Sequence, residues 1–144
     1  MSQYLLDVSV LLALHWPRHT AHAKVKQWFR SSGEKAFSTC ALTQAGFVRI
    51  VTNPTFLQDK ITFSEARQLL HELTRMKGHT FWPINTEFVE ATVPLERRIL
   101  GHRQVTDAYL LGLAIQKKGV LATLDRAIRH LAGDEFSQNV LVIE

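Results

Sequence analysis

The stretch "QYLLDVSVLLALHWP" (residues 3–17) decides how the chain begins to fold. Residues 3–7 form a short apolar run that ends in an acid, which predicts a strand closed by Asp7. Residues 8–14 are also apolar but favour a helix, and "HWP" at 15–17 breaks it. The chain therefore starts with a strand, an aspartate at the turn and a helix.

The same alternation continues along the rest of the sequence. Strands are predicted over 35–40, 79–84, 120–125 and 139–144, and helices over 19–33, 42–54, 62–78, 86–101, 106–119 and 126–133, with a break or restart at Pro94. Thr43 is the expected N-cap of its helix, and Thr62 with Glu65 forms a capping box. Strands that alternate with helices in this way predict an α/β fold, a parallel sheet of four to five strands wrapped on both faces.

The composition is that of an ordinary globular domain. Of 144 residues, 46% are hydrophobic and 21% charged, and a chain of this length buries a core without disulfides, so one domain over 1–144 is expected. The single cysteine, Cys40, lies in apolar surroundings and is expected to be buried rather than nucleophilic. No apolar run reaches the roughly 18 residues of a membrane helix and no basic leader is visible, which predicts a cytoplasmic protein. The net charge of +4 is a weak indication of an anionic partner.

Four polar residues are predicted to meet at one edge of the sheet. Asp7 and Asp125 close the first and fourth strands, while Gln44 and Asp107 start helices. In a parallel sheet the ends of the strands and the starts of the following helices share an edge. Carboxylates gathered there repel one another unless a cation neutralises them, and oxygen ligands suit Mg²⁺ or Mn²⁺. The sequence therefore predicts a divalent-cation site at the edge where Asp7, Asp107 and Asp125 meet.

Each aspartate also has a simpler interpretation as a helix cap. Asp7 and Asp125 lie where a strand turns into a helix, and Asp107, after Thr106, has the position of a first-turn acid favoured by the helix dipole. Capping explains Asp7 and Asp125 well when each is considered alone, and only their meeting at one edge favours a metal. The histidines show no zinc spacing, and the sequence has no GxGxxG, P-loop or GxSxG motif.

Four segments resemble the PIN-domain ribonucleases, and among them the VapC toxins of bacterial toxin–antitoxin pairs. They are "YLLDVSVLLAL" (4–14), "LTQAGFVRIVTNP" (42–54), "GHRQVTDAYLLGLA" (101–114) and "GVLATLDRAIRHL" (119–131), and the resemblance covers essentially the whole chain. It implies a three-layer PIN-like fold, Mg²⁺- or Mn²⁺-dependent cleavage of RNA, and a VapB-like antitoxin that blocks the site. It also implies a homodimer, with tRNA as the commonest class of substrate.

The resemblance assigns roles to individual residues. Asp7, Asp107 and Asp125 match the family's acidic positions, whereas the family often has a further glutamate where this chain has Gln44. Since an amide offers one neutral oxygen, Gln44 is expected to weaken metal binding. Asp7 and Asp107 would hold the metal directly or through water, and Asp125 would hold a metal water or position the nucleophile. The expected supporting residues are Gln44, Thr106 and Thr123 as orienting groups and Arg49, Arg98 and Arg103 as contacts to RNA phosphates, with solvation as the alternative for Arg98.

Three functions stay open at this point. The first is a metal-dependent endoribonuclease toxin, and the second is a catalytically weakened module that binds RNA or a partner, suggested by Gln44. The third is a phosphotransfer enzyme with Asp7 as nucleophile, for which the chain lacks a suitably placed late lysine. The candidates for contact with a second copy or an antitoxin are Leu11, Leu12, Trp16 and Phe56, although core packing is the default for Leu11 and Leu12.

Overall fold

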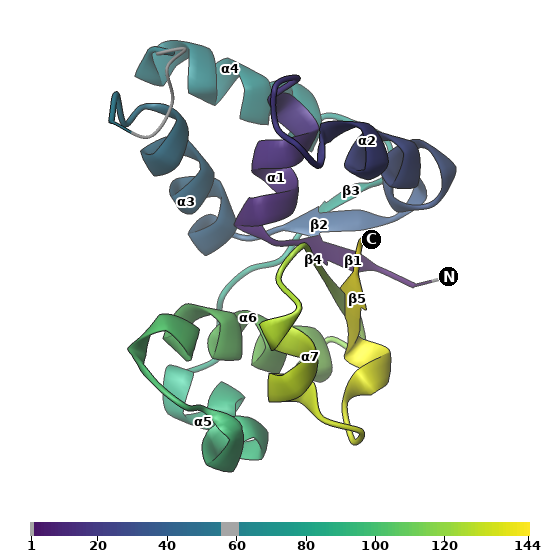
Figure 1. Ribbon diagram of the computed structural model, residues 1–144, viewed down its shortest axis with the longest axis vertical. Helices are drawn as coiled ribbons and strands as arrows, with labels where there is room; N and C mark the ends of the chain where they lie inside the picture. The colour runs from purple at the N-terminus through teal and green to yellow at the C-terminus, as the bar shows by residue number, and fades with distance from the viewer. Residues whose placement is uncertain (1, 56–60) are drawn as a thin grey trace.

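Five parallel strands form one sheet in the order β3-β2-β1-β4-β5 (Figure 1). This computed structural model describes residues 2–55 and 61–144. The strands are β1 (Tyr4–Leu6), β2 (Phe37–Thr39), β3 (His79–Phe81), β4 (Val120–Thr123) and β5 (Val140–Val142). Every predicted strand is present, and each is shorter than predicted. The first strand lies in the middle of the sheet, between β2 and β4.

Helices cover both faces of this sheet (Figure 1). One face carries α1 (Val8–His15), α2 (His22–Ser31), α3 (Ala41–Val51) and α4 (Phe63–Thr74), and the other carries α5 (Phe88–Thr92), α6 (Val105–Gln116) and α7 (Ala127–Ala132). Short 3₁₀ helices are η1 (Gly33–Lys35), η2 (Val93–Arg98), η3 (His102–Gln104) and η4 (Ser137–Asn139). The predicted three-layer α/β architecture is confirmed.

Two helices begin one residue earlier than predicted. α3 begins at Ala41, so Cys40 and not Thr43 has the capping position. Thr43 lies inside the first turn, where its hydroxyl accepts a hydrogen bond from the Cys40 N–H at 3.1 Å. In a capping box, the side chain of the third helical residue accepts a hydrogen bond from the backbone N–H of the cap residue. Thr43 makes this bond from inside the helix. α6 begins at Val105, one residue before the predicted Thr106.

The hydrophobic core lies on both faces of the sheet. α1 to α4 bury one group of apolar side chains against it, and η2, α6 and α7 bury another on the opposite face. α6 is apolar almost all round because it lies between the sheet and the surrounding helices. Leu11 is fully buried and Leu12 is 9% exposed, so their default assignment to the core is confirmed, as is the burial of Cys40. Trp16 is half-buried, and Phe56 lies outside the described residues.

Gly46 brings α3 close to the start of α1. A Cβ at this position would lie 2.8 Å from a methyl carbon of Val8, the residue that follows Asp7. The start of α1 and the second turn of α3 therefore approach each other near the end of β1. Within the described ranges, no helix combines the length and the hydropathy that crossing a membrane requires.

Candidate functional site

Asp7 is a buried carboxylate held by three hydrogen-bond donors. It caps α1, since its Oδ1 accepts from the Val8 N–H at 2.8 Å. Its Oδ2 accepts from the hydroxyls of Ser9 at 3.2 Å and Thr123 at 2.7 Å. Burial raises the pKa of Asp7, the hydrogen bonds from Thr123, Val8 and Ser9 oppose this rise, and the charge of Asp125 adds to it. Asp7 is thus a helix cap whose second oxygen is fixed by two hydroxyl groups.

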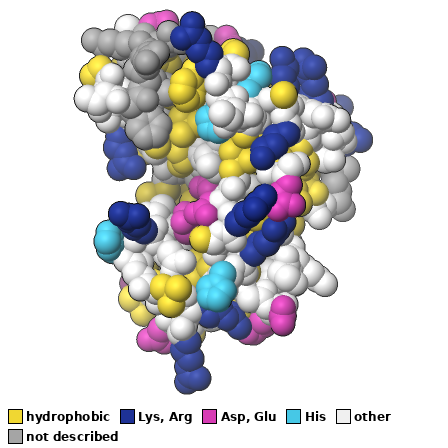
Figure 2. Space-filling view, viewed as in Figure 1, with side chains coloured by type: hydrophobic (Ala, Val, Ile, Leu, Met, Phe, Trp, Pro, Cys, Tyr) yellow, Lys and Arg dark blue, Asp and Glu magenta, His cyan; other side chains and the backbone are white. Residues whose placement is uncertain are grey.

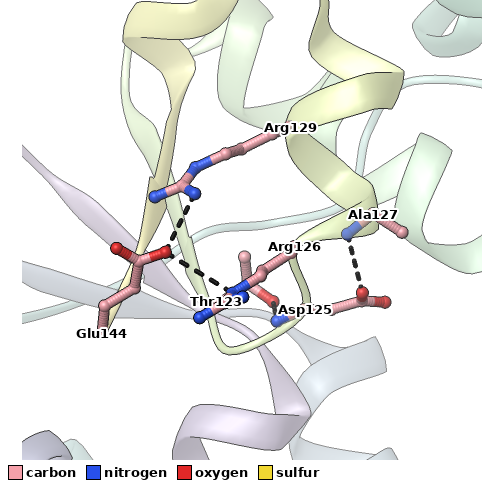
Figure 3. A network of polar contacts seen from close by, with 6 residues as sticks. All are labelled: Thr123, Asp125, Arg126, Ala127, Arg129 and Glu144. Atoms are coloured by element: carbon pink, nitrogen blue, oxygen red, sulfur yellow. Dashed lines mark hydrogen bonds and ion pairs between the residues drawn. The ribbon is translucent and has the colours of Figure 1, made fainter.

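Thr123 joins Asp7 to Asp125. While its hydroxyl donates to Asp7, the same oxygen accepts from the Asp125 N–H at 3.0 Å. Thr123 is fully buried, and its hydroxyl connects the side chain of Asp7 to the backbone of Asp125. The exposed Asp125 carboxylate in turn accepts from the Ala127 N–H at 2.9 Å, at the turn into α7 (Figure 3).

Ser9 also belongs to this network, and the sequence analysis did not identify it. Its hydroxyl donates to Asp7 and accepts from the Leu124 N–H at 3.2 Å. Ser9 and Thr123 therefore hold the end of β4 against the start of α1. The only signal in the sequence was a hydroxyl residue two positions after an acid that closes a strand, a pattern that first helical turns often show.

Asp107 differs from the other two acids. It lies in the first turn of α6, partly buried, and among residues 2–55 and 61–144 no donor forms a hydrogen bond to its carboxylate. Burial, then the charge of Asp7, then that of Asp125 raise the pKa of Asp107 to about 6. Asp107 is therefore close enough to Asp7 and Asp125 for their charges to act on it, and it does not serve as a hydrogen-bonding cap.

The acidic edge formed by Asp7, Asp107 and Asp125 fits a hydrated divalent cation. Figure 2 shows acidic side chains in the middle of one face, with Lys and Arg on either side. No three Asp, Glu, His or Cys side chains in the part of the chain that the structure describes converge closely enough to hold a metal by themselves. Mg²⁺ commonly uses one or two carboxylates and keeps several waters. An acid without hydrogen-bond donors, whose pKa its acidic neighbours raise, is the kind of group that such an ion stabilises.

Gln44 takes part in a separate chain of hydrogen bonds. Its Nε2 donates to the Thr39 hydroxyl at 3.0 Å, and the Thr39 oxygen lies 2.8 Å from Nε2 of His79. Burial lowers the pKa of His79, which favours the neutral ring. These bonds use the amide nitrogen of Gln44 and leave its Oε1 as the unused acceptor. The contacts of the described residues do not join Gln44 to the three aspartates.

The predicted arginine contacts separate into two groups. Arg49 on α3 and Arg103 on η3 are exposed, as is Thr106. Arg98 is engaged within the protein instead: it donates to the Ala132 carbonyl at 3.3 Å and pairs with Glu135 at 3.4 Å.

Arg98 therefore connects η2 to α7 and the turn after it. Its guanidinium also lies 5.9 Å from the centre of the Phe136 ring. Simple solvation therefore does not describe this side chain, and its contact with RNA stays a prediction.

Comparison with known proteins gives a consistent picture. Residues 4–134 match the family model described as PIN domain. The chain is 43% identical over 128 residues to Ribonuclease VapC38 of Mycobacterium tuberculosis, covering 89% of each sequence, and 38% identical to Ribonuclease VapC39 of the same species, covering 89% of this chain and 92% of that one. Among solved structures, FitAcB from Neisseria gonorrhoeae is similar with a TM-score of 0.60 at 18% identity, covering 98% of this chain and 96% of that one. FitAB bound to an IR36 DNA fragment gives 0.63 at 16% identity, covering 96% and 94%.

Proposed function

The chain belongs to the PIN-domain family as a VapC-like ribonuclease, and from this premise we propose that it is a toxin endoribonuclease that hydrolyses RNA phosphodiester bonds at the acidic edge. One observation carries the assignment of the site. Asp7, Asp107 and Asp125 come from three separate parts of the chain, burial and the charges of the other two raise the pKa of Asp107, and Asp107 has no hydrogen-bond donor among the described residues. Such an arrangement costs stability in the free protein, as expected of a binding site for a cation.

We propose Mg²⁺ or Mn²⁺ as the cofactor, with Asp7 and Asp107 as direct or water-mediated ligands. When bound, the ion supplies a water of lowered pKa and neutralises negative charge on the phosphate. Ser9 and Thr123 fix the rotamer of Asp7, so this ligand is oriented before any ion arrives. Asp125, exposed beside them, is proposed to position the attacking water by accepting its hydrogen bond.

The phosphotransfer hypothesis receives less support from this geometry. Both oxygens of Asp7 accept hydrogen bonds and its side chain is only 7% exposed, which leaves little access for an attack on a phosphate. A strand-end aspartate that acts as a nucleophile needs one oxygen free to reach its target.

The proposed partners are RNA, with tRNA as the substrate class that the family resemblance favours, a VapB-like antitoxin and a second copy of the chain. Leu11 and Leu12 are not available to them, because both are buried. Apolar surface is available on the other layer, where Val89, Val93 and Leu100 are 75%, 63% and 77% exposed. Arg49, Arg103 and Thr106, all exposed, stay candidates for RNA contact, and Gln44 stays a candidate orienting group.

The function is tested with purified protein, a tRNA pool and total RNA, in Mn²⁺ or Mg²⁺ and in EDTA. We expect cleavage with the metals and none in EDTA. Asp7→Asn and Asp107→Asn should each abolish cleavage while circular dichroism shows an intact fold, and Asp134→Asn, an exposed acid on the turn after α7, should cleave normally. Protein that binds these RNAs in Mn²⁺ but leaves them intact would refute the enzyme and select the weakened binding module that Gln44 suggests.

A further inference from the structure

Two arginines contact one carboxylate beside the acidic edge. Oε1 of Glu144 lies 3.0 Å from Nη1 of Arg129 and 3.5 Å from Nε of Arg126 (Figure 3). The hydrogen bond and charge of Arg129 lower the pKa of Glu144, and the charges of Arg126 and Lys24 lower it further. We call Arg126 and Arg129 the cation cluster. Their two positive charges face the side-chain carboxylate of Glu144.

The cation cluster lies at the same edge of the sheet as the three aspartates. Arg126 directly follows Asp125, and the two side chains leave the same turn in different directions (Figure 3). Glu144 lies just beyond the end of β5, which pairs in parallel with β4, where Thr123 holds Asp7. A strand of RNA whose scissile phosphate lies at the acids would therefore pass the cluster with a neighbouring phosphate.

Glu144 is held weakly enough to be displaced. The side chains of Arg126, Arg129 and Glu144 are 78%, 52% and 50% exposed, and ion pairs with such exposure contribute little to stability. Guanidinium groups bind phosphate oxygens through charge-assisted and often paired hydrogen bonds. Both arginines also line a hollow of about 1090 Å³ together with His130, which leaves room for the nucleotide that carries the phosphate.

We propose that the cation cluster is a subsite for an RNA phosphate next to the scissile bond, and that Glu144 occupies this subsite as a competing anion in the free protein. The proposal rests on the proposed function, since it assumes that RNA lies along the acidic edge. It assigns Arg126 and Arg129 to substrate binding and Glu144 to a competing, affinity-lowering role.

The test measures equilibrium binding of a short fluorescein-labelled RNA of mixed sequence by anisotropy. All variants carry Asp107→Asn, so that the RNA stays intact. The double variant Arg126→Gln with Arg129→Gln should weaken RNA binding about tenfold. It should also make the slope of the logarithm of the association constant against the logarithm of the salt concentration shallower by roughly one to two. Glu144→Gln should tighten binding a few-fold, because it removes the competing anion.

A double control, Lys35→Gln with Lys117→Gln, removes the same charge from exposed positions before β2 and β4, at the opposite edge of the sheet. The proposal is overturned if the arginine pair loses no more affinity than this control, or if Glu144→Gln binds as before or more weakly. If Glu144 only held the two arginines in place, Glu144→Gln would break these ion pairs, and RNA would bind as before or more weakly. Wild-type protein that cuts RNA while Glu144→Gln fails to bind more tightly would refute this subsite and leave the nuclease intact.

Discussion

Asp107→Asn is expected to stabilise the metal-free protein at neutral pH. Burial and the charges of Asp7 and Asp125 raise the pKa of Asp107 to about 6, from an ordinary 3.8. At about 1.4 kcal/mol per pKa unit this shift corresponds to at most about 3 kcal/mol. Because the carboxylate is partly exposed, solvent screening reduces the expected effect to about 1–2 kcal/mol. A favourable first-turn interaction with the helix dipole, about 0.3–1 kcal/mol, is smaller and opposite in sign.

The pH dependence follows from the direction of the shift. The pKa of Asp107 is higher in the folded than in the unfolded protein, so folding takes up a proton between these two values. The contribution of Asp107 to stability is therefore most favourable below about pH 4, falls as the pH rises toward 6 and stays low above it. Since asparagine resembles the protonated acid, the gain from Asp107→Asn should be small near pH 4.5 and complete near pH 7.5.

Urea unfolding in EDTA at these two pH values measures the effect, with Asp134→Asn as an exposed acid-to-amide control. Adding Mn²⁺ should reverse the order, because the metal stabilises wild-type protein through a ligand that the variant lacks. The reasoning would be refuted if, in EDTA, Asp107→Asn lowered the stability of the protein by the same amount at neutral and at low pH. That result would mean that Asp107 is a first-turn acid that supports α6, as its sequence position alone allowed.

Three further predictions concern positions around the acidic edge. Gly112→Ala should destabilise the protein by about 2 kcal/mol or more in urea unfolding, because its Cβ would overlap the Ala91 carbonyl oxygen; unchanged stability would contradict this packing. Thr123→Val should lower the single-turnover cleavage rate by roughly 10–100-fold whereas Thr123→Ser retains it, and equal losses would rule out a role for the hydroxyl. Thr39→Val should slow cleavage about tenfold, because the Thr39 hydroxyl orients the amide of Gln44. In a chain that also carries Gln44→Glu the same change should have no effect, since both ends of a carboxylate are oxygen atoms. Similar losses in both chains would exclude orientation of Gln44 as the cause.

The sequence predicted the order and type of the main elements because their signals are local. Apolar runs, a capping box at Thr62 and the restart at Pro94 each depend on neighbouring residues, and the structure has all of them. The start of α3 was missed because threonine usually caps from outside a helix. Here Thr43 caps the backbone from inside, and no local pattern distinguishes the two.

The candidate site was predictable only in part, for a related reason. Asp7 and Asp125 follow strands, so parallel topology alone brings them to one edge. The partners of Arg98 lie 34 and 37 residues away along the chain, and Ser9 meets Leu124 across 115 residues. Contacts of this kind depend on how two layers pack, which a pattern of neighbouring residues does not encode.

The hydrogen bond between Asp7 and Thr123 spans 116 positions of the chain. During translation Asp7 is therefore synthesised long before Thr123, whose hydroxyl orients it, and before the neighbouring Asp125. A growing chain has no oriented Asp7 until β4 has been synthesised and has joined β1. For a protein proposed to cut RNA, the acidic edge would be complete only after this late step.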